Sequence, residues 1–321
     1  ADGYGLHPNL TGLLELIDNG QAAIVQGVGY PNPNRSHFTS TDIWHTGNHS
    51  GQGYGWLGKY FDNTCAGKPN PNGSIAIGNK APLALHGKTQ KAVNFETEEL
   101  FKWAGSTVDN SLKNSYDTIN RKEVEAKEND SQLDFLVRTS LDAQVSSDRI
   151  RAAVSKQPLL NYPDGQLAQQ LQLIASMIRA DLPTRVYYAS LGGFDTHANQ
   201  LNSHGNLMRQ LGDALNAFQK DLKKQGNSGK VMTMVFSEFG RRVAQNGSNG
   251  TDHGTAAPMF LIGDNVKHGL LGKHPSLTTL DEGDLKFNTD FREVYAAILE
   301  DWMGADSKAV LGKKYTKAKV L

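Results

Sequence analysis

Hydrophobic and polar positions alternate along the chain with two different periods, and these periods predict helices and strands in turn. Apolar residues three and four positions apart predict helices over residues 8–19, 37–46, 51–61, 164–181, 198–225 and 290–304. Short continuous apolar runs predict strands over residues 22–29, 73–78, 81–87, 184–193, 230–240 and 256–263. In the last helix, Asp290 is in position to cap the N-terminus.

This succession is typical of an α/β fold with a mostly parallel central sheet and helices on both faces. Residues 95–182 differ from the rest, because they are polar and rich in Lys, Glu, Asn, Ser and Gln, with a mostly helical pattern. We therefore expect a single domain over residues 1–321, with a helical insertion or cap at 95–182 whose last helix returns to the sheet.

The charge balance argues against a nucleic acid or a membrane as the partner. Lys and Arg together number 33, as do Asp and Glu, and no apolar run approaches the ~20 residues that span a bilayer. Cys65 is the only cysteine, which excludes an internal disulfide and a multi-cysteine zinc site. The first residue is Ala1, which predicts a processed or incomplete N-terminus.

Polar residues that can bind a metal follow the predicted strand 184–193. Open α/β sheets bind ligands at the carboxyl ends of their strands. The sequence there is Gly192-Gly193-Phe194-Asp195-Thr196-His197, and a carboxylate with a neutral imidazole suits zinc, manganese or iron better than calcium. Alternatively, Asp195 caps the following helix and His197 is a surface residue.

Three further clusters lie near predicted strand ends. Glu238 follows the apolar run of residues 231–236 and precedes two arginines, Arg241 and Arg242, which can bind an anionic oxygen or form surface ion pairs. Asp252 and His253 precede a strand, so their loop has to fold back to reach the same edge. They hold either a metal or each other through a hydrogen bond.

The remaining cluster is Arg35-Ser36-His37, at a predicted strand-to-helix junction. Ser36 is either a nucleophile at a helix N-terminus, where an anion is favoured, or simply the helix N-cap. His204 lies on the apolar stripe of its helix and is better explained as a partly buried structural histidine.

Several stretches together resemble a known family. They are "GLHPNLTGLLEL", "VGYPNPNRSHFTSTDIWHTG", "GGFDTHANQ", "SEFGRR", "NGTDHGTAAPMFLIG" and "DFREVYAAILEDW", which are similar to the bacterial secreted family catalogued as domain of unknown function 1501. That family is grouped with the alkaline phosphatase and sulfatase superfamily, whose members use one or two metal ions at strand ends. The resemblance implies an alkaline phosphatase-like fold and one or two divalent ions of zinc, manganese, iron or calcium. It also implies a twin-arginine export signal and a periplasmic or extracellular location.

The resemblance carries over residue by residue, with two departures. Ser36 stands where the superfamily has its nucleophile, and Asp195 and His197 resemble an acid and a histidine of the second metal site. The superfamily's Asp-His-Gly is here Glu238-Phe239-Gly240, so one histidine ligand is lost, and Asp252 with His253 compensates or supplies a later ligand. The superfamily's first strand and its aspartate would precede this chain, so we expect an N-terminal strand to be missing.

These observations predict a metal-dependent hydrolase of phosphate or sulfate esters, acting on a small anionic ester. The expected ligands are Asp195, His197, Glu238, Asp252 and His253. Ser36 would be the nucleophile, His37 an acid–base group, and Arg35 or Arg241 would hold the substrate's oxygens. The alternative is a non-catalytic secreted protein with a degraded metal site, which binds another protein. Phe239 and the missing first strand favour that alternative.

Overall fold

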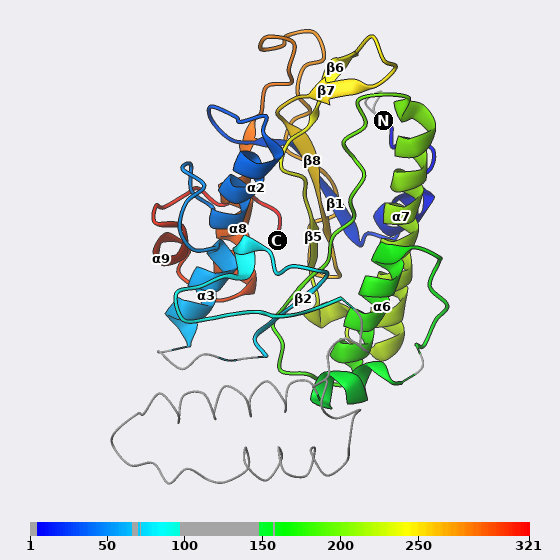
Figure 1. The fold of residues 1–321 in the computed structure, drawn as a ribbon, viewed down its shortest axis with the longest axis vertical. Helices are drawn as coiled ribbons and strands as arrows, with labels where there is room; N and C mark the ends of the chain where they lie inside the picture. Colours follow the sequence, from blue (N-terminus) through cyan, green and yellow to red (C-terminus); the bar gives the residue numbers. More distant parts are fainter. Residues whose placement is uncertain (1–4, 66–69, 71, 97–147, 157) are drawn as a thin grey trace.

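The computed structural model describes residues 5–65, 70, 72–96, 148–156 and 158–321. Its strands form a central layer with helices on both sides (Figure 1). One side carries α1 (Thr11–Asp18), α6 (Gln166–Arg179) and α7 (Gln200–Gln225). The other side carries α2 (His37–Thr46), α3 (Trp56–Thr64), α8 (Phe291–Ala297) and α9 (Ser307–Leu311). The predicted α/β class, with helices on both faces, is therefore confirmed.

The larger sheet has the strand order β10-β1-β8-β5, with β9 also paired to β1. Its strands are β1 (Ala22–Gly29), β5 (Thr233–Val235), β8 (Ala257–Ile262), β9 (Gly269–Leu271) and β10 (Thr289–Asp290). A smaller parallel sheet has the order β3-β2-β4, formed by β2 (Ser74–Ile77), β3 (Val93–Phe95) and β4 (Val186–Tyr188). A hairpin of β6 (Arg241–Gln245) and β7 (Thr251–His253) stands at one end.

The larger sheet is mixed, so a mostly parallel central sheet is not what this structure shows. β1 is parallel to β9 and β10, whereas β8 is antiparallel to both β1 and β5. The physical reason lies between β5 and β8. The chain connects them through the β6–β7 hairpin rather than through a crossover helix, so β8 returns in the opposite direction.

Two apolar cores lie on the two faces of the sheets. One core, beneath α2, α3 and α8, contains stacked aromatic rings, with Trp44 4.3 Å from Phe291 and Trp56 4.2 Å from Tyr295 between ring centroids. The other core, beneath α1, α6 and α7, is mainly aliphatic and includes Phe95 and Phe218. In α6 the predicted stripe is buried at Leu167, Leu171 and Ile174. The helical periodicity therefore identified most of the buried face of α6, whereas Leu201, on the stripe predicted in α7, is exposed.

Some element predictions were wrong or fall outside the described residues. Residues 81–87 do not form a strand but contain the 3₁₀ turn η1 (Leu83–Leu85). Asp290 caps α8 as predicted, since its side chain accepts a hydrogen bond from the Arg292 N–H, and a π-helical turn, η4 (Ile298–Trp302), continues that helix. In the insertion predicted at 95–182, residues 148–154 and α6 are helical, and residues 97–147 lie outside the described part.

Candidate metal centre

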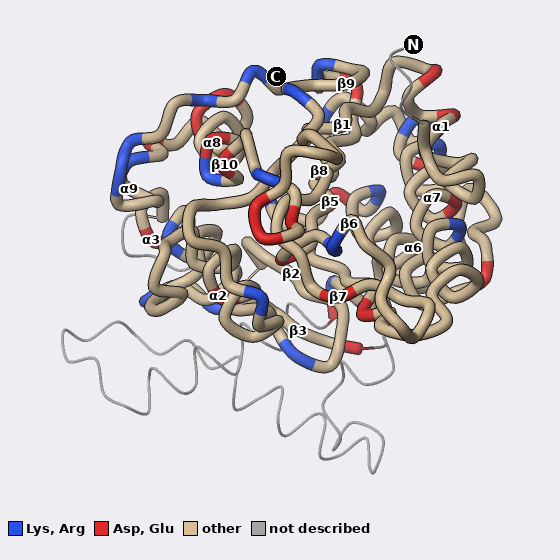
Figure 2. The backbone as a smooth tube through the Cα atoms, turned by 90° about the horizontal axis from the view of Figure 1, so that it is seen from above, with Lys and Arg blue, Asp and Glu red and all other residues tan. Residues whose placement is uncertain are grey.

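The candidate site lies where four chain segments meet at one end of the sheets. β4 leads through Gly193, whose φ is +94°, to Asp195 and His197. β5 leads to Glu238, β7 ends at His253, and α2 begins at His37. Seen from this end, the β6–β7 hairpin lies between α2 and α7, and charges of both signs surround it (Figure 2). Because β8 is antiparallel, His253 precedes it at the edge where β5 ends, and no loop has to fold back.

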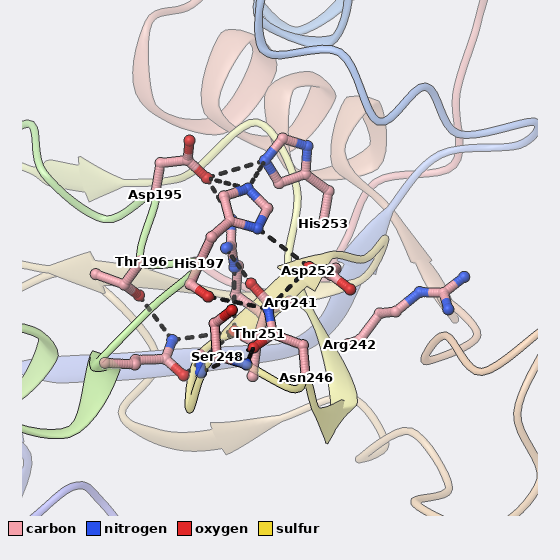
Figure 3. Close-up of polar contacts among 12 residues, drawn as sticks. Asp195, Thr196, His197, Arg241, Arg242, Asn246, Ser248, Thr251, Asp252 and His253 are labelled. Carbon is pink, nitrogen blue, oxygen red and sulfur yellow. Dashed lines mark hydrogen bonds and ion pairs between the residues drawn. The ribbon is translucent and has the colours of Figure 1, made fainter.

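The Asp195 carboxylate is the common partner of three imidazoles. Its Oδ1 lies 2.9 Å from Nε2 of His197 and 2.9 Å from Nε2 of His253. Its Oδ2 lies 3.3 Å from Nε2 of His37. The Nε2 atoms of His197 and His253 are themselves 2.9 Å apart (Figure 3). We call these four residues the histidine–aspartate cluster.

Each imidazole of the cluster also has an oxygen partner for its second nitrogen, Nδ1. The three pairs are His37 with Glu238 Oε1 at 2.6 Å, His197 with Asp252 Oδ1 at 3.1 Å, and His253 with the carbonyl oxygen of Arg35 at 2.8 Å. A carbonyl oxygen only accepts hydrogen bonds, so Nδ1 of His253 carries a proton. In the neutral ring Nε2 then presents its lone pair to the other members of the cluster.

One nitrogen of the cluster has no hydrogen bond of its own. Nε2 of His37 is buried, and its contact with Asp195 Oδ2 at 3.3 Å is an ion pair that lacks the geometry of a hydrogen bond. His37, Asp195 and His253 each offer a ligand atom, and these atoms all lie within 4.8 Å of one another. Three residues of the described chain are thus arranged so that they could hold a metal ion.

The interactions in and around the cluster raise the pKa of a histidine and lower the pKa values of two carboxyl groups. Burial alone would lower the pKa of His37, but the hydrogen bond to Glu238 and the charges of Glu238 and Asp195 raise it above its usual value. Burial alone would raise the pKa of Asp195, but the hydrogen bond from Arg241 and the interactions with the neighbouring histidines lower it. Hydrogen bonds from Asn246 and His197 lower the pKa of Asp252. All three shifts favour the charged forms.

The three arginines near the site have different partners. Arg241 donates from Nη1 to Asp195 Oδ1 at 2.8 Å and from Nε to Thr251 Oγ1 at 3.2 Å, and Nη2 bonds the Thr251 carbonyl oxygen. Arg35 instead forms an ion pair with the buried Asp284, as does Arg242, at 3.4 Å. Of the two arginines predicted to hold an anion, the structure brings only the guanidinium of Arg241 to the cluster.

Ser36 occupies the N-cap position of α2, but its side chain makes no capping hydrogen bond. The residue is exposed, and its backbone N–H bonds Asn34 Oδ1 at 2.8 Å. The hydroxyl that the sequence suggested as either a nucleophile or a cap is therefore next to His37 in the chain and makes no hydrogen bond among the described residues.

Phe239 packs against two histidines of the cluster. Its buried ring lies 4.9 Å from the ring of His37 and 4.7 Å from that of His253, between centroids. His204 is half-buried and packs edge-on against Phe194 at 5.9 Å, as a structural histidine would. Its Nδ1 is nevertheless buried without a hydrogen bond.

Sequence reasoning missed Asn246, which organises the hairpin loop. Its amide donates to Asp252 Oδ1 and to the His197 carbonyl oxygen, both at 3.0 Å, and its own side-chain oxygen accepts from the Ser248 and Gly250 N–H groups. A Cβ on Gly250 would lie 2.2 Å from the carbonyl carbon of His197, so only glycine fits there. The stretch "QNGSNG" could have indicated this role, because an asparagine in a glycine-rich turn commonly hydrogen-bonds the backbone two residues later, here at Ser248.

Comparison with known proteins gives the chain a family but no characterised relative. The curated proteins contain no match. Among solved structures the chain is similar to Ps i-CgsB in complex with k-i-k-neocarrahexaose, with 8% identity, a TM-score of 0.43, and coverage of 95% of this chain and 67% of that one. This likeness is too distant to bear on function. Residues 7–313 match the family described as "Protein of unknown function (DUF1501)", and the chain belongs to that family.

Proposed function

We propose that the protein binds one divalent transition-metal ion through His37, Asp195 and His253, with His197 as a fourth ligand. The observation that carries this proposal is the convergence of one ligand atom from each of the first three residues within 4.8 Å of one another. Imidazole and carboxylate groups that converge in this way are ordinarily paired with one another or bound to a metal.

The donor set supports a transition metal. Imidazole nitrogens with one carboxylate are ligands that zinc, manganese and iron accept, whereas calcium takes oxygen ligands. Metal-binding histidines almost always donate their second N–H to a carboxylate or a carbonyl. Glu238, Asp252 and the Arg35 carbonyl stand in that position. In this proposal Glu238 and Asp252 therefore orient ligands, although the sequence suggested them as ligands themselves.

We infer further that the reaction is hydrolysis of a phosphate or sulfate ester. A bound divalent ion would supply Lewis-acid polarisation and a lowered pKa of a coordinated hydroxyl or water. Ser36, with its unengaged hydroxyl beside His37, is the nucleophile of this proposal. The first N–H groups of α2, which have no partner inside the helix, favour an anionic group there.

Arg241 is the residue that holds the substrate's oxygens in this proposal. Its guanidinium has five N–H donors, and three bonds to Asp195 and Thr251 leave donors for an anion. The side chain is 18% exposed, so a substrate at the mouth of the site can reach it. An alkaline phosphatase-like arrangement and an exported protein belong to the same proposal and rest on the resemblance of the motifs.

One observation favours the non-catalytic alternative. Arg241 already places a positive charge 2.8 Å from Asp195 Oδ1, the oxygen that also faces His197 and His253. A cation in that position weakens the attraction of the carboxylate for a metal. In a protein without bound metal, the hydrogen bonds and ion pairs of the cluster would hold the β6–β7 hairpin against α2. Such a protein would act by binding another protein.

The test is metal content by elemental mass spectrometry, on protein purified without a chelator or an affinity tag. The parent should contain about one equivalent of zinc, manganese or iron, and His253→Gln should lose most of it. His268→Gln is the matched control, since His268 is an exposed histidine outside the cluster. Absence of metal from the parent, or equal loss in both variants, would contradict the metal site.

Activity is then tested with 4-nitrophenyl phosphate and 4-nitrophenyl sulfate, using parent, His253→Gln and Ser36→Ala proteins. Hydrolysis that needs both metal and Ser36 supports the hydrolase. Metal in the parent with no hydrolysis of either ester, under conditions where added metal saturates the site, would favour the binding protein.

A further inference from the structure

β4 and β5 each have one strand edge without a partner. β4 ends the order β3-β2-β4, and β5 ends the order β10-β1-β8-β5, so among the described strands neither pairs on its second side. Both strands lead to the same site, because His37 contacts Asp195 after β4 and Glu238 after β5. They therefore run in the same direction, with their carboxyl ends at the histidine–aspartate cluster.

A cavity of about 1640 Å³ lies along these two strands. Every residue of β4 and β5 lines it, and all of them are half-buried, whereas β2 and most of β1 are buried. One wall is formed by apolar side chains of α6 and α7, including Leu171, Leu211 and Phe218. The opposite wall includes Trp56, Ala84 and Ile298. The cavity is therefore bounded by two opposite apolar walls and, between them, by the unpaired edges of β4 and β5.

Backbone chemistry decides which kind of molecule fits. The free edges of β4 and β5 present N–H and C=O groups that need partners once water is excluded. A fatty chain or another apolar ligand would cover the walls but leave those groups unpaired. An extended polypeptide satisfies both edges and both walls at once, as in β-strand addition.

We propose that this cavity binds an extended polypeptide segment, which pairs with β4 and β5 and joins the two sheets. Side chains of such a strand alternate between the two apolar walls, so the segment must be apolar at every position, as in strands that are buried on both faces. It contains no proline, because each N–H faces a strand edge. A length of about five or six residues is usual for such a strand. This inference does not depend on the proposed hydrolase activity.

The test uses acetylated six-residue peptides of Val, Ile and Ala, carrying two lysines at one end for solubility. Binding is measured by fluorescence anisotropy of a labelled peptide, and amide hydrogen exchange of the whole protein is followed by mass spectrometry. A bound strand should protect the amides of residues 186–188 and 233–235 together. Protection of neither strand at any soluble concentration of any of the peptides would overturn the proposal.

Two controls separate a strand from a merely apolar ligand. The same peptide N-methylated at alternate residues keeps its side chains but loses three donors, and it should bind about 100-fold more weakly. Laurate serves as the apolar chain. Strand addition would be overturned if the protein bound laurate and also bound the plain and the N-methylated peptide with equal affinity. Met234→Lys, on the cavity wall, should weaken peptide binding at least about 10-fold, whereas Val243→Lys, on the exposed hairpin, should leave it unchanged.

Discussion

The carbonyl oxygen of Arg35 lies 2.8 Å from Nδ1 of His253, although 218 residues separate the two in the chain. A backbone carbonyl cannot donate a hydrogen bond, so this contact sets the tautomer of His253 and turns Nε2 towards Asp195. The side chain of Arg35 is held elsewhere, by Asp284. The residue therefore contributes to the site through its backbone, and its guanidinium fixes where that backbone lies.

Removing Asp284 is expected to loosen this arrangement. Its side chain is 2% exposed and pairs with Arg35 and Arg242, which are both partly exposed. Asp284→Ala removes the ion pairs with both arginines. We expect the free energy of unfolding, measured by urea denaturation, to fall by about 1–3 kcal/mol. Metal affinity should fall as well, because the Arg35 carbonyl is no longer fixed. Asp306→Ala, at the cap of α9, is a control that should alter stability without altering metal affinity.

Substitutions of Glu238 and Asp252 distinguish the orienting role from direct ligation. If both residues only hold imidazoles, Glu238→Gln and Asp252→Asn should keep the metal stoichiometry and weaken affinity by about 10- to 100-fold. Asp195→Asn should bind far less metal than either. Affinity is measured by competition with a chromogenic chelator. Complete loss of metal from Glu238→Gln would instead make Glu238 a ligand.

Metal binding should weaken on acidification, beginning above pH 6.5. Ligand histidines must lose a proton from Nε2 before they bind, so protons compete with the metal. The pKa of His37 is raised by its carboxylate neighbours, so this competition starts at a higher pH than for an ordinary histidine. The check is the apparent dissociation constant of zinc between pH 5.5 and 8.5. An affinity that is constant across this range would contradict the role of His37.

His45 should make the fold sensitive to acid. Burial lowers its pKa to about 4, and its Nε2 lies 3.2 Å from the Tyr188 hydroxyl. The unfolded chain takes up a proton near pH 6.5 and the folded chain does not, so stability is complete above pH 6.5 and is lost as the pH falls towards 4. At pH 5 the expected loss is about 2 kcal/mol. Urea denaturation at pH 7.5 and pH 5 should show a smaller difference between the two pH values in His45→Gln, and an unchanged difference would refute this origin.

Two glycines of the hairpin loop offer a matched test of its packing. A Cβ on Gly250 would lie 2.2 Å from the carbonyl carbon of His197, whereas a Cβ on Gly247 would have nothing within 4 Å. Gly250→Ala should push His197 away from the cluster, destabilise the protein by about 1–3 kcal/mol and lower metal affinity. Gly247→Ala should do neither. Equal behaviour of the two variants, in thermal unfolding and in metal titration, would show that the loop adapts.

The sequence predicted most elements that have a strong period, and the structure explains the exceptions. The helix over 37–46 was predicted with the observed bounds, and the strand over 22–29 likewise. Residues 81–87 were mistaken for a strand, because a short apolar run such as Leu83 to Leu85 carries no period that separates a strand from a tight turn. The direction of β8 was missed because nothing in the apolar pattern indicates whether a connection is a hairpin or a crossover.

The members of the site could be named from the sequence, but their partners could not. Asp195, His197 and His253 were singled out from local motifs, and the structure brings them together. His37 was suggested as an acid–base group, yet its Nε2 faces Asp195. Residue type alone does not show whether a carboxylate faces the cluster, as that of Asp195 does, or holds the Nδ1 side of an imidazole, as Glu238 and Asp252 do. That difference depends on the contacts of Glu238 with His37 and of Asp252 with His197, which lie 201 and 55 residues apart in the chain.

The long separation of these contacts has a consequence for synthesis on the ribosome. His37 leaves the exit tunnel first, and its hydrogen-bond partner Glu238 follows 201 residues later. Synthesis proceeds at roughly 5–20 residues per second, so at least about 10 seconds pass between the synthesis of His37 and that of Glu238. The complete cluster can form only after the β6–β7 hairpin has emerged, so a metal ion would be captured only once His253 has left the ribosome.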